Sequence, residues 1–150
     1  MLEHCKCGQR YDLDFRLVDF KKQVSIENVP VLACPQCEHE EVLHWVKGDL
    51  TALLNSLPLE GKPYGIDFTD FNELAHIVYH IFTCSEADTK EAFKAEIRLS
   101  CATRINTLLD LYRCACEVGD RAWMDEVEAR LSQLSEKVFV NGQEVRYSSV

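Results

Sequence analysis

Four cysteines near the N-terminus have the residue type and the spacing of a metal site. Cys5 and Cys7 form a C-x-C pair, and Cys34 and Cys37 form a C-x-x-C pair. Zinc prefers four thiolate or imidazole ligands in a tetrahedron, and two tight turns that each donate a close pair are a common way to supply them. The segment between the pairs is long enough for a hairpin that folds one pair onto the other.

The residues around each pair favour tight turns. Pro35 follows the first cysteine of the second pair and presets the φ angle for a bend. Gly8 follows the first pair and can adopt the positive φ that such a turn requires. A thioredoxin-like redox site would instead place C-x-x-C between a strand and a helix, whereas the residues after Cys37 lead into another β-like run. The pattern therefore favours a metal over redox chemistry.

The first pair leaves the fourth ligand open. A C-x-C pair is one residue tighter than the usual C-x-x-C, and His4 stands three residues before Cys7. The ligand set that we expect is Cys5, Cys7, Cys34 and Cys37. His4 is the alternative to Cys5, and His39 and His44 are less favoured. Because four protein ligands leave no position for a catalytic water, we expect one structural Zn²⁺ per chain and no enzyme at this site.

Two histidines further along the chain offer a second chemical possibility. His76 and His80 are four residues apart in a segment with helical periodicity, so their side chains lie on one helix face and could bind a metal ion. The zinc-protease signature H-E-x-x-H is absent because Ile77 stands at the Glu position. A metal-dependent enzyme that uses the His76/His80 helix is therefore the third of our functional hypotheses.

The other four cysteines fall in the helical half of the sequence. Cys84, Cys101 and Cys116 are predicted to be small, buried core residues. Cys114 and Cys116 are two residues apart, and in a helix this spacing points two side chains to opposite sides. Helical context therefore argues against a second shared metal site at this pair.

Charge and hydropathy exclude some classes of function. The formal net charge is −9, which disfavours a nucleic-acid partner because phosphate contacts need Lys and Arg. The start of the sequence has no apolar signal segment, and no later run approaches the roughly 18 apolar residues that cross a bilayer. We therefore expect a cytoplasmic protein that does not enter a membrane. In a reducing compartment, cysteines are metal ligands or free thiols rather than disulfides.

Short strands must position the four N-terminal cysteines. Residues 11–33 contain two runs of β-forming residues, with Asn28 as a turn former and Pro30 unsuited to a central strand. A β module of this size has too small a core to be stable without an additional cross-link. We expect an α+β protein in which a small zinc-ribbon-like β module precedes an α-helical domain with a C-terminal β-hairpin.

The predicted domain boundaries follow from composition and capping residues. The expected parts are a zinc-finger module with a trailing helix at 1–57, a Pro- and Gly-rich linker at 58–67, and the helical domain at 68–150. Thr69 or Asp70 is predicted to cap the first helix of that domain, and Ser85 the next. Gly119 is predicted to end the long helix, and Asp120 to cap the last one. The pair Asn141-Gly142 predicts the terminal hairpin.

The second cysteine pair and the residues before it resemble a known family. The run Ile26-Glu-Asn-Val-Pro-Val-Leu32, followed by Cys34-Pro-Gln-Cys37, resembles the second half of the YgiT-type zinc finger, the N-terminal domain of the MqsA antitoxin family. The resemblance covers about residues 4–45. It implies that Cys7, Cys34 and Cys37 bind zinc, with Cys5 or His4 in the fourth place. It departs from the family at Glu38, where the family usually has Gly.

The resemblance also suggests partners. In those antitoxins the finger contacts a partner protein, and a separate helix-turn-helix reads DNA. The C-terminal region of this chain does not match that helix-turn-helix and carries an excess of acidic residues. An antitoxin-like, DNA-binding transcriptional regulator is therefore our second functional hypothesis.

A shorter resemblance lies in the helical region. Residues 115–127, within about 112–131, are similar to the IDEAL motif, a short helical module of bacilli and their relatives. This likeness implies protein interaction in a bacterial cytosol. Our leading hypothesis is a non-catalytic zinc-binding protein that acts as a protein-interaction or regulatory adaptor. Its partner would be another protein or a second copy of the chain.

Overall fold

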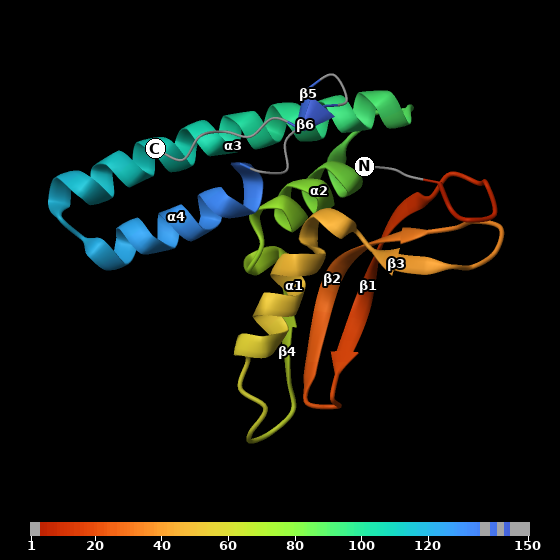
Figure 1. Cartoon of the computed structure of the whole chain (residues 1–150), viewed down its shortest axis with the longest axis horizontal. Coiled ribbons are helices and arrows are strands. Elements are labelled where there is room, and N and C mark those ends of the chain that lie inside the picture. The colour runs from red at the N-terminus through yellow and green to blue at the C-terminus, as the bar shows by residue number, and fades with distance from the viewer. Residues whose placement is uncertain (1–3, 136–138, 141–142, 145–150) are drawn as a thin grey trace. The chain divides into compact units, whose positions relative to one another are not determined.

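The chain folds into two compact units, residues 1–85 and 86–150. The computed structural model describes residues 4–135, 139–140 and 143–144. Within these residues, the first unit contains a four-stranded sheet, two α-helices and a short 3₁₀ helix, and the second contains two α-helices and a short pair of strands (Figure 1). This mixed α+β fold is the class that the sequence predicted. No helix in the described part of the chain combines the length and the apolar character needed to cross a membrane.

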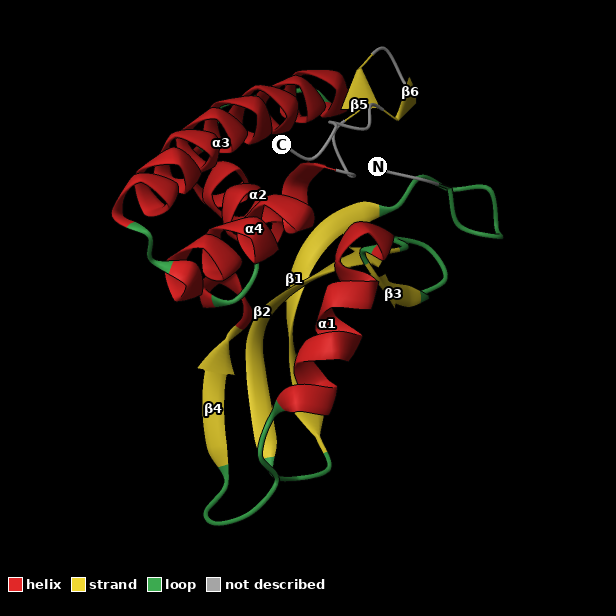
Figure 2. Cartoon of the chain, turned by 60° about the vertical axis from the view of Figure 1, so that its left-hand side comes forward, coloured by secondary structure: helices red, strands yellow, loops and turns green. Residues whose placement is uncertain are grey.

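The sheet of the first unit is built around one long strand. β1 (Asp12–Phe20) and β2 (Val24–Ala33) form an antiparallel hairpin. On the other side of β2, β3 (Glu40–Val42) pairs antiparallel near one end and β4 (Tyr64–Asp67) pairs parallel near the other (Figure 2). β2 is therefore the central strand, with β1 along one side and two short strands along the other.

β2 continues through the two residues that were expected to interrupt it. Asn28 adopts a positive φ of 59° and forms a bulge in the pairing with β1, and its side chain donates a hydrogen bond to Asp67 Oδ2 at 3.0 Å. Pro30 stands opposite Phe15 of β1, but on the other side of β2 it lies in a gap, because the pairing with β4 ends at Glu27 and the pairing with β3 begins at Val31. The strand thus accepts a proline because no neighbouring strand needs its missing N–H.

Helices cover the sheet on both faces. α1 (His44–Ser56) lies along one face (Figure 2). α2 (Glu73–Cys84) packs on the face that carries Phe15, whose ring meets Tyr79 edge-to-face at a centroid distance of 5.1 Å. The run Val29–Leu32 of β2 is buried at every position, as expected for a strand with both faces covered.

The boundary between the units differs from the predicted domain boundary. Residues 58–67 were predicted to be a linker, but their last part is β4, whose Ile66 pairs with Ile26. The 3₁₀ helix η1 (Phe68–Asp70) and α2 also pack on β2, so the first unit ends after Ser85. The Pro and Gly residues correctly indicated a loop between α1 and β4. The apolar side of α2, however, needs a surface to pack against, and the sheet of the first unit supplies it.

α2 begins at another cap than the predicted Thr69 or Asp70. Thr69 and Asp70 belong to η1, and the Thr69 hydroxyl donates to Asp67 Oδ1 at 2.7 Å. The cap of α2 is the buried residue Asn72, whose Oδ1 accepts a hydrogen bond from the Ala75 N–H at 2.8 Å. The sequence offers three capping residues within four positions, Thr69, Asp70 and Asn72, and tertiary packing selects among them.

The second unit is a helical hairpin. α3 (Lys90–Val118) begins after Thr89, whose hydroxyl accepts from a backbone N–H in the first turn, rather than at the predicted Ser85. Gly119 ends α3 with φ 70°, as predicted, and Asp120 caps α4 (Arg121–Ser135) by accepting from the Trp123 N–H.

The apolar residues of this hairpin form its core. Leu108 and Ala115 of α3 and Val127 and Leu134 of α4 are buried. β5 (Phe139–Val140) and β6 (Gln143–Glu144) pair antiparallel, which agrees with the predicted terminal hairpin. Its predicted turn, Asn141-Gly142, lies outside the described residues.

The two hydrogen bonds of the Asn72 side chain lead to a prediction about the stability of the first unit. Besides capping α2, its Nδ2 donates to Asp49 Oδ2 of α1 at 3.0 Å. We expect Asn72→Ala to lower the free energy of unfolding by about 2 kcal/mol, because it removes the cap of α2, takes the acceptor from the buried Ala75 N–H and breaks the hydrogen bond to Asp49. Denaturant unfolding followed by circular dichroism measures this change.

Thr89→Ala is the matched control, because Thr89 caps α3 at an exposed position and makes the same kind of bond. It should cost about 1 kcal/mol or less. Equal losses for the two variants would contradict the role of Asn72 as a link between α1 and α2.

Candidate metal centre

The register of the sheet brings the two cysteine pairs together. Asp12 at the start of β1 pairs with Ala33 at the end of β2. In an antiparallel pair, the chain that enters one strand and the chain that leaves the other meet at the same end. The loop 4–10 and the loop 34–39 therefore lie side by side at that end of the sheet (Figures 1 and 2).

The four predicted cysteine ligands form one cluster. The Sγ atoms of Cys5, Cys7, Cys34 and Cys37 all lie within 4.8 Å of one another. Sulfur atoms that surround a zinc ion at about 2.3 Å in a tetrahedron are about 3.8 Å apart, so small adjustments bring these thiols into ligand geometry. The four side chains can hold a metal ion, and the donor set agrees with the predicted zinc.

His4 does not join this cluster. It is exposed, and it forms an isolated antiparallel bridge with Arg10 across the first loop. The group of potential ligands contains Cys5 in its place, and Cys5 is buried. The C-x-C spacing thus suffices to bring both thiols of the first pair to the same point.

Backbone hydrogen bonds shape the first loop into a tight turn. The Gly8 N–H donates to the Cys5 carbonyl at 2.9 Å, and the Cys5 N–H donates to the Gln9 carbonyl at 2.8 Å. Gly8 has φ 90°, as its place after the pair predicted. This conformation favours glycine, because a side chain there would clash with the backbone. The turn directs the thiols of Cys5 and Cys7 toward the second loop.

The second loop forms a turn of the same kind. The Cys34 N–H donates to the His39 carbonyl at 2.8 Å, and the Cys37 N–H donates to the Cys34 Sγ at 3.5 Å. Glu38 has φ 59°, a left-handed conformation that costs a residue with a side chain about 1 kcal/mol. This is the position at which the resembling family usually has Gly, so the loop keeps the glycine conformation without the glycine.

The hydrogen bonds in the cluster give its thiols different pKa values. The N–H of Cys37 donates to Cys34 and, with further donors, lowers the pKa of Cys34 to about 6 despite burial. At Cys37 the N–H of His39 lowers the pKa, but Cys5 and Cys34 outweigh it and raise the pKa to about 12. Because ligands bind a metal as thiolates, metal binding must displace the proton that Cys37 holds.

One neighbour of the centre was not singled out from the sequence. Tyr11 is buried beside the cluster, and its ring lies 6.3 Å from that of His39. Burial, a hydrogen bond with the Cys5 side chain and the charge of Glu41 raise the pKa of Tyr11 to about 12. An aromatic residue directly after the first cysteine turn was the available signal. Tyr11 is thus a buried polar side chain in contact with Cys5.

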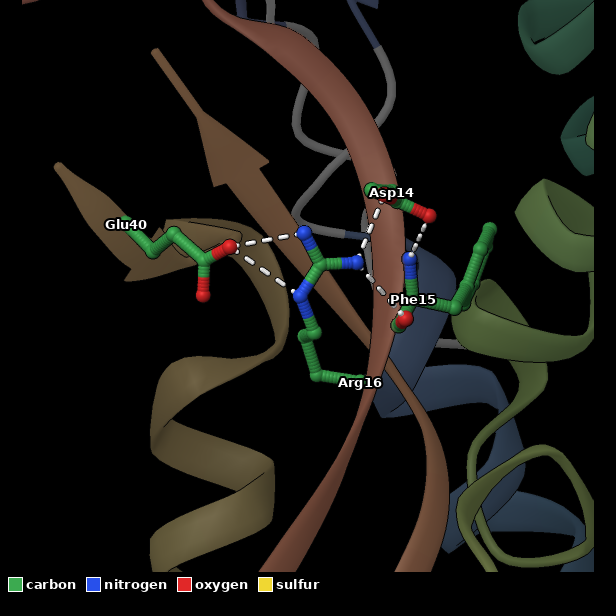
Figure 3. A network of polar contacts seen from close by, with 4 residues as sticks. All are labelled: Asp14, Phe15, Arg16 and Glu40. Carbon is green, nitrogen blue, oxygen red and sulfur yellow. Dashed lines mark hydrogen bonds and ion pairs between the residues drawn. The ribbon is translucent and has the colours of Figure 1, made fainter. Parts of the chain in front are cut away.

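A polar network ties β1 to β3 next to the second loop (Figure 3). The Arg16 guanidinium donates through Nε and Nη2 to Glu40 Oε1, at 3.0 and 2.7 Å, and Nη1 lies 2.6 Å from Asp14 Oδ2. These side chains are roughly 40% exposed or more, so each ion pair contributes at most about 1 kcal/mol. The network fixes the start of β3, where the second cysteine loop ends.

The histidines of the third functional hypothesis do not form a comparable cluster. His76 and His80 are both exposed on α2, and His80 Nδ1 lies 3.9 Å from Cys84 Sγ. Within the part of the chain that the structure describes, the four-cysteine cluster is the only group of three or more potential metal ligands. His39 lies 3.6 Å from a Glu41 carboxylate oxygen, and the ring of His44 meets that of Trp45 edge-to-face at a centroid distance of 6.0 Å.

The remaining cysteines differ in exposure. Cys101 is buried, as predicted, and burial raises its pKa to about 12. Cys84 and Cys116 are exposed, so the prediction that they are core residues was wrong. Cys84 is the last residue of α2, and Cys116 is rotated by about 100° from the buried Ala115. Cys114 is exposed as well.

These environments predict three classes of thiol in the metal-loaded protein. Cys84, Cys114 and Cys116 should react at once with a thiol reagent such as dithionitrobenzoate. The four cluster cysteines should react after a chelator removes the metal, and Cys101 only after unfolding. Timed absorbance with mass spectrometry of labelled peptides measures the order. Rapid labelling of the cluster before chelation would contradict metal ligation.

Comparison with known proteins adds no relative from which a role could be taken. No family model matches the sequence, and neither a curated protein nor a solved structure matches the chain. The likeness of residues 4–45 to the YgiT-type finger therefore stays a prediction from the residues quoted for it. The four-cysteine cluster is therefore the feature of this chain that points to a function.

Proposed function

We propose that this chain is a non-catalytic zinc protein that acts as a protein-binding adaptor, with one Zn²⁺ bound by Cys5, Cys7, Cys34 and Cys37. The observation that carries the proposal is the meeting of four thiols within 4.8 Å from two separate loops. Among the described residues, no strand pairing connects loop 4–10 with loop 34–39. A shared metal ion would supply the missing connection.

The donor set favours zinc among the common metal ions. Four thiolates are soft ligands, which Mg²⁺ and Ca²⁺ avoid. A tetrahedral four-sulfur site selects Zn²⁺ or iron, and zinc keeps its oxidation state and needs no further ligand. Because four sulfur atoms close its coordination sphere, the ion would have no open position for water or substrate. Its role would be to hold the finger together.

The energetics of the first unit support a structural role. The hairpin that carries the cysteines contains several residues in left-handed backbone conformations, each of which costs about 1 kcal/mol. Structural zinc supplies folding free energy, because the unfolded chain has no preformed site. The ion would thus offset local strain that the small sheet carries.

Two features support an adaptor role. The net charge of −9 disfavours a polyanionic partner, which leaves proteins as the most suitable partners. Large apolar side chains are exposed in both units: Leu17, Phe71 and Phe82 in the first, and Leu99 and Val118 in the second. Aromatic and aliphatic side chains of this kind form the centres of protein interfaces. The DNA-binding regulator and the His76/His80 enzyme stay predictions of the sequence alone.

Cys34→Ser tests the metal site. We expect the purified wild-type chain to contain about one zinc ion and the variant to contain far less, because a hydroxyl is a poor zinc ligand. Loss of the ion should lower the thermal midpoint by roughly 10 °C or more. Plasma mass spectrometry gives the metal content, and circular dichroism gives the midpoint.

Cys84→Ser is the matched control, since Cys84 is an exposed cysteine outside the cluster. Its zinc content and thermal midpoint should equal those of the wild type. Metal-free protein from a preparation without chelators, or zinc retained by Cys34→Ser, would refute the proposed site.

A second experiment tests the adaptor role. The tagged full chain, expressed in its native host, should copurify with one protein at a defined stoichiometry. Leu99→Ser with Val118→Ser should reduce this recovery at least tenfold if the second unit binds the partner, because both side chains are about 70% exposed and contribute little to the core.

Leu17→Ser is the control in the first unit, because Leu17 is 62% exposed. Sedimentation of the pure chain shows whether the partner is a second copy. A monomer that recovers no stoichiometric partner would contradict the adaptor role while leaving the zinc site intact.

A further inference from the structure

We propose that the four-cysteine centre is a redox-sensitive site. A peroxide would convert its thiolates into the disulfides Cys5–Cys37 and Cys7–Cys34 and release the metal, while the two loops stay joined. This inference rests on the proposed zinc site and extends it to regulation of that site by oxidation. Of the possible pairings of the four cysteines, only these two would form.

The distances between the sulfur atoms select these pairs. Cys5 Sγ lies 3.2 Å from Cys37 Sγ, and Cys7 Sγ lies 3.5 Å from Cys34 Sγ. A disulfide bond is about 2.05 Å long, so each pair closes by movements of little more than about 1 Å. Both contacts cross from one loop to the other.

The exposure of the four residues gives each pair one accessible member and one protected member. Cys37 is exposed and faces the buried Cys5, and Cys7 is exposed and faces the buried Cys34. An oxidant from solvent therefore reaches the exposed residue of each pair more readily than the buried one. The buried sulfur next to it is then in place to complete the disulfide before a second oxidant molecule arrives.

The chemistry balances with two molecules of peroxide per centre. The Cys37 thiolate attacks one peroxide oxygen, which breaks the O–O bond, forms a sulfenic acid and releases hydroxide. The Cys5 thiolate attacks that sulfur, forms the S–S bond and releases a second hydroxide. The same two steps join Cys7 to Cys34. Four thiolates lose four electrons in total, both peroxides are reduced, and the metal ion leaves because no thiolate remains.

Each disulfide connects the same two loops that the metal would connect. The joined residues are 32 and 27 positions apart in the sequence, so each covalent bond closes a long loop. A cross-link of this length stabilises the folded chain as a zinc ion would. A bond between Cys34 and Cys37 would lie within one loop and would leave the loops unconnected. The oxidised protein should therefore be free of metal and still folded.

The experiment uses the full chain with Cys84→Ser, Cys114→Ser and Cys116→Ser, which removes the exposed thiols outside the centre and retains the buried Cys101. The zinc-loaded protein is treated with hydrogen peroxide beside a chromophoric zinc chelator. Peptide mapping without reduction identifies the disulfides, and circular dichroism follows the fold. We expect release of one zinc per chain, the linkages 5–37 and 7–34, and a thermal midpoint within a few degrees of the zinc form. A dithiol reductant should restore zinc binding.

Three outcomes would overturn the inference: a dominant Cys34–Cys37 linkage, unfolding when the metal leaves, or zinc retained under peroxide that oxidises free thiols. Zinc measured before oxidation tests the proposed function separately. In addition, Cys7→Ser with Cys34→Ser leaves the pair Cys5 and Cys37 without a complete metal site. Peroxide should still form the 5–37 disulfide in this variant, and its absence would contradict the geometry whether or not the wild type binds zinc.

Discussion

The antiparallel register of β1 and β2 is the constraint on which the candidate centre depends. Because Asp12 pairs with Ala33, the loop that precedes β1 and the loop that follows β2 emerge at one end of the sheet. A shift of one residue would turn every side chain of one strand to the other face and would displace one cysteine pair from the other. The buried side chains of β2 prevent such a shift, since both faces of this strand are covered. The position of the thiols is thus set by a hydrophobic pattern some distance from them.

The register of β1 and β2 would in turn be stabilised by a cross-link at the centre. In the part of the chain that the structure describes, every residue other than glycine with a positive φ lies on the hairpin or in the second cysteine loop: Lys21, Lys22, Asn28 and Glu38. Lys21 and Lys22 form the turn between β1 and β2, where Asn-Gly would be easier to accommodate. A small sheet with several such positions would gain stability from a cross-link at the end where the two cysteine loops lie, opposite the β1–β2 turn. The proposed ion, or the disulfides that would replace it, would stabilise the register that creates the site.

The sequence predicted the parts of this arrangement that depend on local chemistry. The cysteine spacing indicated which thiols meet, and Gly8 and Gly119 indicated the left-handed turns. The β-forming runs at the start of the sequence and the helical periodicity after them indicated the α+β class. Features that depend on tertiary contacts were missed. Tyr64–Asp67 looks like the end of a linker because its four residues form a strand only beside β2. Asn72 became the cap of α2 because α1 offers its side chain a second partner, and no local pattern shows this.

The atoms around the proposed zinc ion can be identified directly. X-ray absorption at the zinc edge of the purified full chain reports the type, number and distance of the atoms around the ion. The structure predicts four sulfur atoms at about 2.3 Å and no nitrogen, because Cys5 rather than His4 lies with the other three thiols. A shell of three sulfur atoms and one nitrogen at about 2.0 Å would place a histidine in the site and contradict the cluster, and a shell of oxygen atoms would exclude it altogether.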